Sequence, residues 1–534
     1  MTTVETATIT ADELHDLVGG EAEYALLDVR EPAVTAAQGS ILLAVSVPLS
    51  VLELRVHTRI PRLSTPVIVY DGGDDHLADR AAGRLAQLGY TDVRVLDGGL
   101  RAWAASGHKV QSGGDHVIGQ AFGEWIEHVY QTPHITVAEF RERVAAGEDV
   151  VLLDSRPIGE FENHSLPGGV SIPGAELVYR AAEVVKSPDS LVVVNCAGRT
   201  RSILGAQALI NAGLPNRVVS LEGGTQSWVL EGHQLDHGAS VAVPAPGDGA
   251  AEPAKQAAAR FAERFDIKRI DKGTLQQFRD EADTRSLYVL DVRTPEEFDA
   301  GHLAGSRSAP SWDVAPWTFR HVGTHNARIV LVDNDTVRAT VAASWITQIG
   351  WGDVFVLDNA FDNEPLETGL LPIAFDIPQD GYRVIDAAAL DAALGDSAVV
   401  DLSLSPAYRA GHIPGAHFAI RARLAAADIP GTGPIVLTSE DAVLARFAAA
   451  DLAAETDRDV AVLDGGTQAW RAAGLPLESR TESWLHDADD VVPSGWRETD
   501  PERRKAGFRR YLSWELGLVA ELEQDDTVPF RKFD

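Results

Sequence analysis

The chain contains a single cysteine, Cys196, and its surroundings suit nucleophilic chemistry. It lies in the segment 192–205, VVVNCAGRTRSILG, between an apolar run and two arginines. A thiol attacks as its thiolate, and nearby cations or helix amides lower the thiol pKa and so favour that form. We therefore predict that Cys196 is a nucleophile whose pKa is lowered by Arg199, Arg201 and the start of a helix.

The residues after Cys196 are expected to form a loop that binds an anion. Residues 191–194 are apolar and predict a strand, and helical periodicity begins near Thr200. The thiol would then lie at the edge where open α/β sheets bind ligands, and helix-start amides attract anions there. A cysteine that is only a small buried apolar residue is the alternative, which Gly198 and the arginines disfavour. The candidate substrate-binding residues of this loop are Ala197, Gly198, Arg199, Thr200, Arg201 and Ser202.

Composition excludes several classes of function. The formal net charge of −33 argues against binding to nucleic acid or to an anionic membrane. One cysteine excludes an intramolecular disulfide and a cysteine-cluster site, and the 16 histidines show no paired-ligand spacing, so we predict no metal. The N-terminus has no signal-peptide pattern and the apolar run 41–54 is too short to span a bilayer, so we expect a cytoplasmic protein.

One plan recurs four times along the chain. Each copy has an apolar strand that ends in Asp, a second apolar strand, a helix and a third strand, and three copies close with a Gly-Gly turn before Trp. The alternation of strands and helices predicts an α/β fold in which each copy is a domain with a mainly parallel sheet and helices on both faces. The first strands and their continuations are LLDVREP (26–32), LLDSRPIGEF (152–161), VLDVRTPEEF (289–298) and VVDLSLSPAY (399–408).

The joints between the copies differ in composition. Residues 112–132 join the first two and include a helical pattern, FGEWIEHVY. The segment 238–259 is rich in Ala, Pro and Gly and is expected to be an extended linker. Copies three and four meet near 375–382. In the C-terminal tail, ERRKAGFRRYLSWELGLVAELEQ predicts an amphipathic helix that packs against the body.

Three separated motifs make the chain resemble the rhodanese-homology family of sulfurtransferases. They are the repeated D-x-R, the LDGGxxxW turn, and the segments FENHSLPGGVSIPGA (161–175), FDAGHLAGSRSAP (298–310) and YRAGHIPGAHF (408–418). The resemblance implies four tandem rhodanese-like domains at 5–111, 133–237, 263–375 and 380–478, followed by a tail at 479–534.

The resemblance also implies a reaction. In this family a cysteine opens a six-residue loop, takes sulfane sulfur from a donor and becomes a persulfide, which points to Cys196 as the catalytic residue. It implies a small anionic sulfur donor such as thiosulfate, a thiol, cyanide or a protein as acceptor, and no cofactor. The loop departs from C-x-x-G-x-R in having its Gly two positions after the cysteine, which leaves the donor preference open.

Two other functions remain in view. Cysteine phosphatases of related architecture use C-x5-R, but here the sixth residue after Cys196 is Ser202, and the shorter loop favours sulfur over phosphate. The second alternative is a sulfur-carrying or regulatory scaffold, because three copies lack the nucleophile and serve at most to bind partners. The corresponding residues in those copies are Asp71, Asp333 and Ser439.

Arg156 is a further candidate for substrate binding, since it belongs to the D-x-R pair of the second copy. Similar pairs occur in copies without a cysteine, at Asp28/Arg30 and Asp291/Arg293, which favours a structural ion pair. The same comparison favours structural roles for Glu160 and His164. Trp228 and Trp470 are expected to anchor the core.

Overall fold

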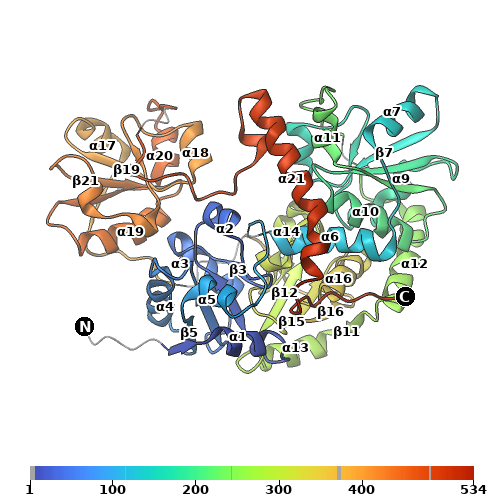
Figure 1. Ribbon diagram of the computed structural model, residues 1–534, viewed down its shortest axis with the longest axis horizontal. Coiled ribbons are helices and arrows are strands. Elements are labelled where there is room, and N and C mark those ends of the chain that lie inside the picture. Colours follow the sequence, from blue (N-terminus) through green and yellow to red (C-terminus); the bar gives the residue numbers. More distant parts are fainter. Residues whose placement is uncertain (1–6, 115, 242, 370–374, 480–482) are drawn as a thin grey trace.

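A computed structural model of the protein describes residues 7–114, 116–241, 243–369, 375–479 and 483–534. It contains four parallel five-stranded sheets with helices around them, one in each repeat (Figure 1). This confirms the predicted fold class. Small parts of the predicted first and third domains and of the tail, residues 5–6, 370–374 and 480–482, lie outside the described residues.

The second sheet positions the cysteine. Its order is β6-β10-β9-β7-β8, and all of its strand pairs are parallel. Central strand β9 is buried along its whole length, as its apolar run LVVVN requires of a strand covered on both faces. The strands are β6 (His134–Ile135), β7 (Val150–Asp154), β8 (Val170–Ser171), β9 (Leu191–Asn195) and β10 (Val218–Leu221).

The other three sheets repeat this order. The first consists of β1 (Ala7–Ile9), β5 (Val93–Leu96), β4 (Val67–Tyr70), β2 (Ala25–Asp28) and β3 (Val45–Ser46). The third consists of β11 (Lys268–Ile270), β16 (Asp353–Leu357), β15 (Arg328–Val332), β12 (Leu287–Asp291) and β14 (Arg307–Ser308). The fourth consists of β18 (Arg383–Ile385), β22 (Val460–Leu463), β21 (Ile435–Thr438), β19 (Ala398–Asp401) and β20 (His417–Phe418).

The joint between the first two domains is a packed helix, α6 (Val117–Tyr130), as its sequence predicts. The expected extended linker at 238–259 is wrong over its second half, which belongs to helix α12 (Asp248–Arg264). Its alanines favour a helix, and Ala254, Ala257 and Phe261 are buried where α12 contacts α9 (Glu176–Val184) and α16 (Val337–Ile349). Tertiary packing therefore overrides the linker-like composition.

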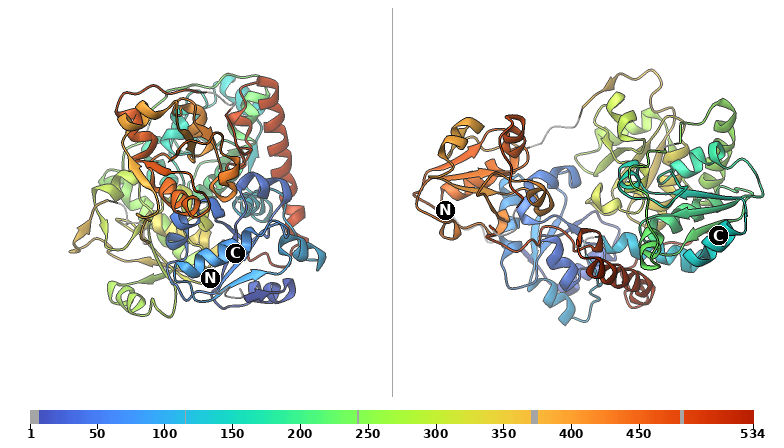
Figure 2. Two further views of the ribbon diagram at one scale, coloured as in Figure 1. Left: turned by 90° about the vertical axis from the view of Figure 1, so that its left-hand side faces the viewer. Right: turned by 90° about the horizontal axis from the view of Figure 1, so that it is seen from above.

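The tail folds back across the second domain. Its helix α21 (Pro501–Leu522) lies against α6 and α11 (Gly224–Leu230), as Figure 1 shows. The fourth domain stands at one end of the molecule, beside the first (Figures 1 and 2). The tail predicted to pack on the body thus does so on the domain that contains Cys196.

Candidate active site

Cys196 follows β9 directly, and the loop after it leads into α10 (Thr200–Asn211). Its side chain is 2% exposed. The thiol donates to the hydroxyl of Ser202 over 3.6 Å, and that hydroxyl donates to the carbonyl of Arg199 over 2.7 Å. The predicted placement at a strand-to-helix junction is therefore correct, but the thiol is closed off from solvent.

The Gly-Gly turn, Gly223 and Gly224, packs directly against the backbone of the loop. The amides of Thr225 and Gln226 donate to the carbonyls of Cys196 and Ala197 over 3.0 and 3.1 Å. A Cβ on Gly224, where φ is +48°, would lie 2.1 Å from the Cys196 carbonyl oxygen, so only glycine fits. The turn therefore contacts the loop backbone directly and leaves no room for a side chain at Gly224.

The backbone N–H groups of the loop make no hydrogen bond to the described protein residues. Among the described residues, no acceptor is recorded for the N–H groups of residues 197–201. Such N–H groups beside a helix start attract negative charge. The loop can therefore hold an anion next to the sulfur.

Arg201 closes one side of this loop. Two of its guanidinium nitrogens donate to the Glu160 carboxylate, each over 2.8 Å. The guanidinium also lies over the ring of Trp317, 5.3 Å from its centroid, and Trp317 belongs to the third domain. The cysteine-less third domain thus supplies part of the wall beside the loop.

Arg199 faces helix α6. Its guanidinium donates to both oxygens of Glu124, over 2.7 and 3.0 Å, and to Glu127. Both Arg199 and Glu124 are buried. Glu124 and Glu127 thus hold the loop against α6. The loop and the helix are in close contact, since a Cβ on Gly123 of α6 would lie 2.8 Å from the Thr200 side chain.

Helix α21 covers the loop from the other side. Glu515 is fully buried, and its Oε1 accepts a hydrogen bond from the Thr200 hydroxyl over 3.3 Å. Its Oε2 has no partner among the described residues. A Cβ on Gly198 would lie 3.0 Å from that oxygen and 3.1 Å from Tyr511 Cε1, so helix and loop touch at Gly198.

Burial governs the titration of this region. It raises the pKa of Glu515 to about 8, with Glu124 adding to the rise and Arg199 opposing it. It also raises the pKa of Cys196, although Arg201 and Ser202 lower it. The predicted lowered thiol pKa is wrong for this closed arrangement, because loss of water outweighs the favourable charges.

Arg156 is fully buried in the ion pair that the sequence favoured. Its guanidinium donates to Asp154 Oδ1 and Oδ2 over 2.9 and 2.7 Å, and to the His164 carbonyl over 2.7 Å. His164 also stacks on Trp496 of the tail, and burial lowers its pKa to about 4. A further contact joins Arg156 Nη1 to His164 Nε2 over 3.0 Å. Among the described residues, these hydrogen bonds hold Arg156 on β7 and His164, and none of them reaches the loop after Cys196.

Comparison with known proteins gives this arrangement a family. A model of the rhodanese-like domain matches residues 10–106, 136–231, 274–363 and 386–473, more than half of the chain. This chain belongs to the rhodanese-like family.

Individual rhodanese-like proteins agree with this assignment. A crystal structure of a thiosulfate sulfurtransferase from Pseudomonas aeruginosa is 41% identical over 99% of this chain and all of its own, with a TM-score of 0.94. The thiosulfate sulfurtransferase GlpE of the same species is 30% identical over 96 residues, 18% of this chain and 82% of its own. A sulfurtransferase of Allochromatium vinosum is 32% identical over 91 residues, 17% of this chain and 82% of its own.

The three cysteine-less rhodanese loops are filled by their own side chains. In the third domain, the Asp333 carboxylate accepts hydrogen bonds from the amides of Thr336, Arg338 and Ala339. In the first, Asp71 accepts from the amides of Gly73 and Ala78.

The fourth loop is filled more weakly. Its Ser439 hydroxyl accepts one hydrogen bond, from the Ala445 amide over 3.3 Å.

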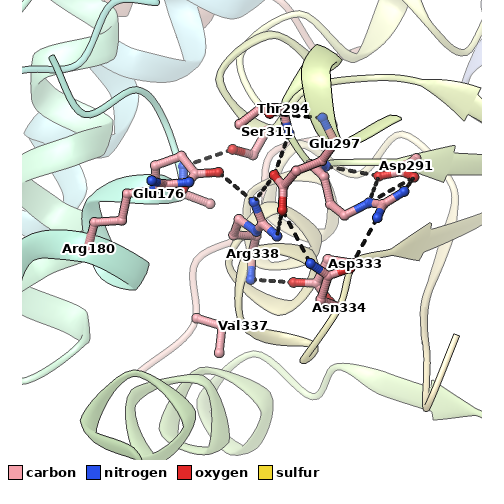
Figure 3. A network of polar contacts seen from close by, with 12 residues as sticks. Glu176, Arg180, Asp291, Thr294, Glu297, Ser311, Asp333, Asn334, Val337 and Arg338 are labelled. Atoms are coloured by element: carbon pink, nitrogen blue, oxygen red, sulfur yellow. Dashed lines mark hydrogen bonds and ion pairs between the residues drawn. The ribbon is translucent and has the colours of Figure 1, made fainter. Parts of the chain in front are cut away.

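Arg338 occupies the place in the third loop that Arg201 has in the second. It donates to Glu297, the counterpart of Glu160, and to Glu176 of the second domain (Figure 3). Arg338 is fully buried. An arginine at this loop position therefore persists without a cysteine, as a joint between two rhodanese domains.

The described residues were also compared with the requirements of a metal site and of a membrane span. Within the described ranges, no group of three or more His, Cys, Asp or Glu side chains is arranged to hold a metal ion. None of the helices in that part of the chain combines the length and apolar character that crossing a membrane requires.

Sequence reasoning missed the residues that enclose the loop. They come from the joint helix, the third domain and the tail, and they are Gln120, Glu124, Trp317, Tyr511 and Glu515. An acidic residue in WELGL looks like an ordinary solvent-facing position of an amphipathic helix. Only the tertiary packing reveals that Glu515 meets the loop.

Proposed function

We propose that the protein is a sulfurtransferase that moves sulfane sulfur from thiosulfate, or from a persulfide donor, through a persulfide on Cys196. The observation that supports this best is the row of backbone N–H groups beside the one thiol, for which the described residues provide no acceptor. A doubly charged small anion fits such a loop, and the outer sulfur of thiosulfate would meet Sγ there.

The first half-reaction forms one S–S bond and breaks another. The Cys196 thiolate attacks the outer sulfur of thiosulfate, and sulfite leaves with the electron pair of the broken bond. The persulfide anion that remains is stabilised by the amides of residues 197–201 and by the positive charge of Arg201. Ser202 turns its hydroxyl to donate to sulfur once the thiol proton is gone.

The second half-reaction restores the thiolate. Cyanide in an assay, or a thiol or a protein acceptor in the cell, attacks the outer sulfur, and Cys196 leaves as thiolate. The chain has no second cysteine, so the acceptor must come from outside. No cofactor takes part in either step.

A donor can reach the thiol only if the side chains of α21 that cover the loop move aside. Cys196 is 2% exposed, and Gly198 touches Glu515 and Tyr511 of α21. Displacement of these side chains would admit both water and the donor, and the returning water would lower the thiol pKa toward its usual value.

Intact-mass measurement tests the assignment. After incubation with thiosulfate, the wild-type chain should gain the mass of one sulfur atom on Cys196 and then lose it to cyanide with release of thiocyanate. Cys196→Ser should do neither. Full thiocyanate production by Cys196→Ser would disprove the site.

The burial of the thiol also supports the second candidate, a sulfur-carrying scaffold. In that case Cys196 would take up one sulfur atom, but turnover with thiosulfate and cyanide would be negligible. Comparing the rate of sulfur loading with the steady-state rate separates the carrier from the enzyme.

A further inference from the structure

Helix α21 begins with a basic stretch that is unusual in this acidic chain. Residues 503–510, RRKAGFRR, contain five Lys or Arg and no Asp or Glu, whereas the whole chain has a formal net charge of −33. The stretch belongs to the helix that folds back over the second domain. A concentrated positive charge therefore lies close to the loop after Cys196.

The solvent-facing arginines of this stretch are not paired. Arg503, Arg509 and Arg510 are exposed, and no ion pair joins any of them to another described residue. Lys505 is paired at the surface with Glu502, over 3.4 Å. An exposed guanidinium without a carboxylate can bind one from another molecule through two parallel hydrogen bonds.

The following turns of α21 add an apolar contact on the same outer face. Leu516 is 57% exposed, more than any other large apolar side chain of the described residues. Exposed Ser513 and Ala520 on either side of it carry no charge. From Arg503 to Leu516 the helix rises about 20 Å, which is much longer than a small anion such as thiosulfate. A surface of this length, basic at one end and apolar at the other, fits a macromolecule.

The inner face of the same helix covers the cysteine loop. Tyr511 and Glu515 approach Gly198, and a Cβ on Gly223 would lie 3.3 Å from Leu512. The helix lies along the outside of the molecule in two views at right angles (Figures 1 and 2). A partner bound to its outer face therefore contacts the element that must shift before the thiol can be reached.

We propose that the outer face of α21, from Arg503 to Leu516, is the docking surface for an acidic protein that accepts sulfur from Cys196. This inference rests on the sulfurtransferase function proposed above. Carboxylates of the partner would pair with the arginines, and one of its apolar side chains would cover Leu516. The partner's thiolate attacks the outer sulfur of the persulfide, an S–S bond forms on the partner, and Cys196 leaves as thiolate.

The charge of the remaining chain favours a protein over a nucleic acid as this partner. A nucleic acid is a continuous polyanion, and beyond the basic stretch it would meet an acidic surface. A folded protein can confine its carboxylates to a patch of matching size. Repulsion elsewhere would then restrict its docking to α21.

Fluorescence anisotropy with the full chain tests the docking. The probe is a labelled helical peptide that is rich in Glu and carries one Leu and a C-terminal Cys. At low ionic strength we expect saturable binding, and none by the same peptide with Gln at every Glu. Arg509→Glu/Arg510→Glu should weaken binding by at least about tenfold, and Leu516→Ser by a few-fold. Arg217→Glu/Lys255→Glu, a matched reversal of two exposed charges on other elements, should bind like the wild type.

Sulfur transfer is followed separately. Each chain is loaded with thiosulfate, the load on Cys196 is checked by intact mass, and the sulfur gained by the peptide's cysteine is measured over time. The uncharged thiol 2-mercaptoethanol serves as the reference acceptor. Arg509→Glu/Arg510→Glu should lower the ratio of the peptide rate to the 2-mercaptoethanol rate by at least about tenfold.

The outcomes separate the docking from the chemistry. If the wild type does not bind the Glu peptide, or if Arg509→Glu/Arg510→Glu binds it equally well, the docking surface is overturned even where Cys196 loads sulfur. Binding without loading of Cys196 would instead overturn the sulfurtransferase function, and with it the role of the partner as acceptor. A single-stranded oligonucleotide of the same net charge that binds as tightly as the peptide would overturn the choice of a protein.

Discussion

The loops that begin at Cys196 and Asp333 have the same place in two successive domains, yet their backbone N–H groups are used differently. The amides after Cys196 have no acceptor among the described residues, whereas three amides after Asp333 donate to its own carboxylate. The backbone differs too, since Thr336 has φ +66° and Arg199, at the same loop position, has φ −121°.

The comparison shows how little separates the proposed catalytic loop from a loop without a cysteine in the same fold. Asp333 does more than replace the thiol, because its carboxylate accepts the amides that the proposed donor anion would use in the second loop. The arginine and its glutamate partner stay in both loops, as Arg201 with Glu160 and Arg338 with Glu297. The difference between the loops is therefore concentrated in one residue and the turn that follows it.

The largest effect is expected when the second loop is made like the third. Cys196→Asp and Cys196→Ser should both lose thiocyanate formation by at least about 10⁴-fold, since the nucleophile is gone. Only Cys196→Asp should also lose thiosulfate binding, because its carboxylate fills the amides. Calorimetry measures that binding. Equal thiosulfate affinity in the two variants would show that the aspartate does not block the loop amides.

The two arginines should respond differently to removal. Arg201→Ala is expected to lower kcat/KM by about 10²–10³-fold, because the charge beside the persulfide is lost. Arg338→Ala, in a loop that has no thiol, should leave kcat/KM nearly unchanged but lower the free energy of unfolding by up to about 3–5 kcal/mol. The reason is that buried Glu176 would keep Arg180 as its remaining recorded cation partner. Steady-state kinetics and denaturant unfolding of both variants check this pair.

Introducing a thiol into the third loop tests how strongly the loop backbone affects the rate of sulfur loading. In the Cys196→Ser background, Asp333→Cys should gain sulfur from thiosulfate roughly 10²-fold more slowly than the natural site, because the left-handed turn at Thr336 misplaces the amides. Mass measurement over time gives the rate. Loading as fast as at Cys196 would show that the cysteine alone makes the difference.

The smallest effect concerns Glu515. Because its pKa is about 8 in the folded chain and about 4.5 when unfolded, the folded state binds the extra proton between these values. Stability is thus lost as the pH rises through that window, and Glu515→Gln should remove up to about 1–3 kcal/mol of this pH dependence. Denaturant unfolding at pH 5, 6.5 and 8 measures it, and parallel profiles for both chains would contradict the assignment.

Glu515→Gln should also change activity by a few-fold above pH 8. Ionised Glu515 adds a negative charge beside Gly198 and Thr200, which weakens binding of an anionic donor. Above pH 8, the KM for thiosulfate should rise in the wild type and stay unchanged in Glu515→Gln. Glu523→Gln, which removes a carboxylate at an exposed position just after α21, is a matched control that should not shift this profile.

The repeat architecture and the position of the cysteine could be predicted because they depend on local patterns. Apolar strands ending in Asp and the Gly-Gly turn recur in sequence, and each has a local physical cause. The helix at Asp248–Arg264 could not be predicted, because its composition resembles a linker until α9 and α16 pack on it.

The residues of α21 that cover the cysteine loop could not be predicted from the sequence, for a different reason. Glu515 and Tyr511 lie more than three hundred positions beyond the cysteine, and nothing in their local sequence marks them. The predicted direction of the Cys196 pKa shift was wrong for the same reason. The sequence displays the nearby charges, which lower that pKa, but not the burial, which raises it more.

The position of Trp317 over Arg201 has a consequence for how this chain can be used. The second domain, cut out by itself, would leave behind the tryptophan, helix α6 and helix α21, and with them three of the walls around its thiol. It is therefore not a transplantable module. Protein engineers who need a compact sulfur-transfer unit would have to take the whole chain or rebuild those walls.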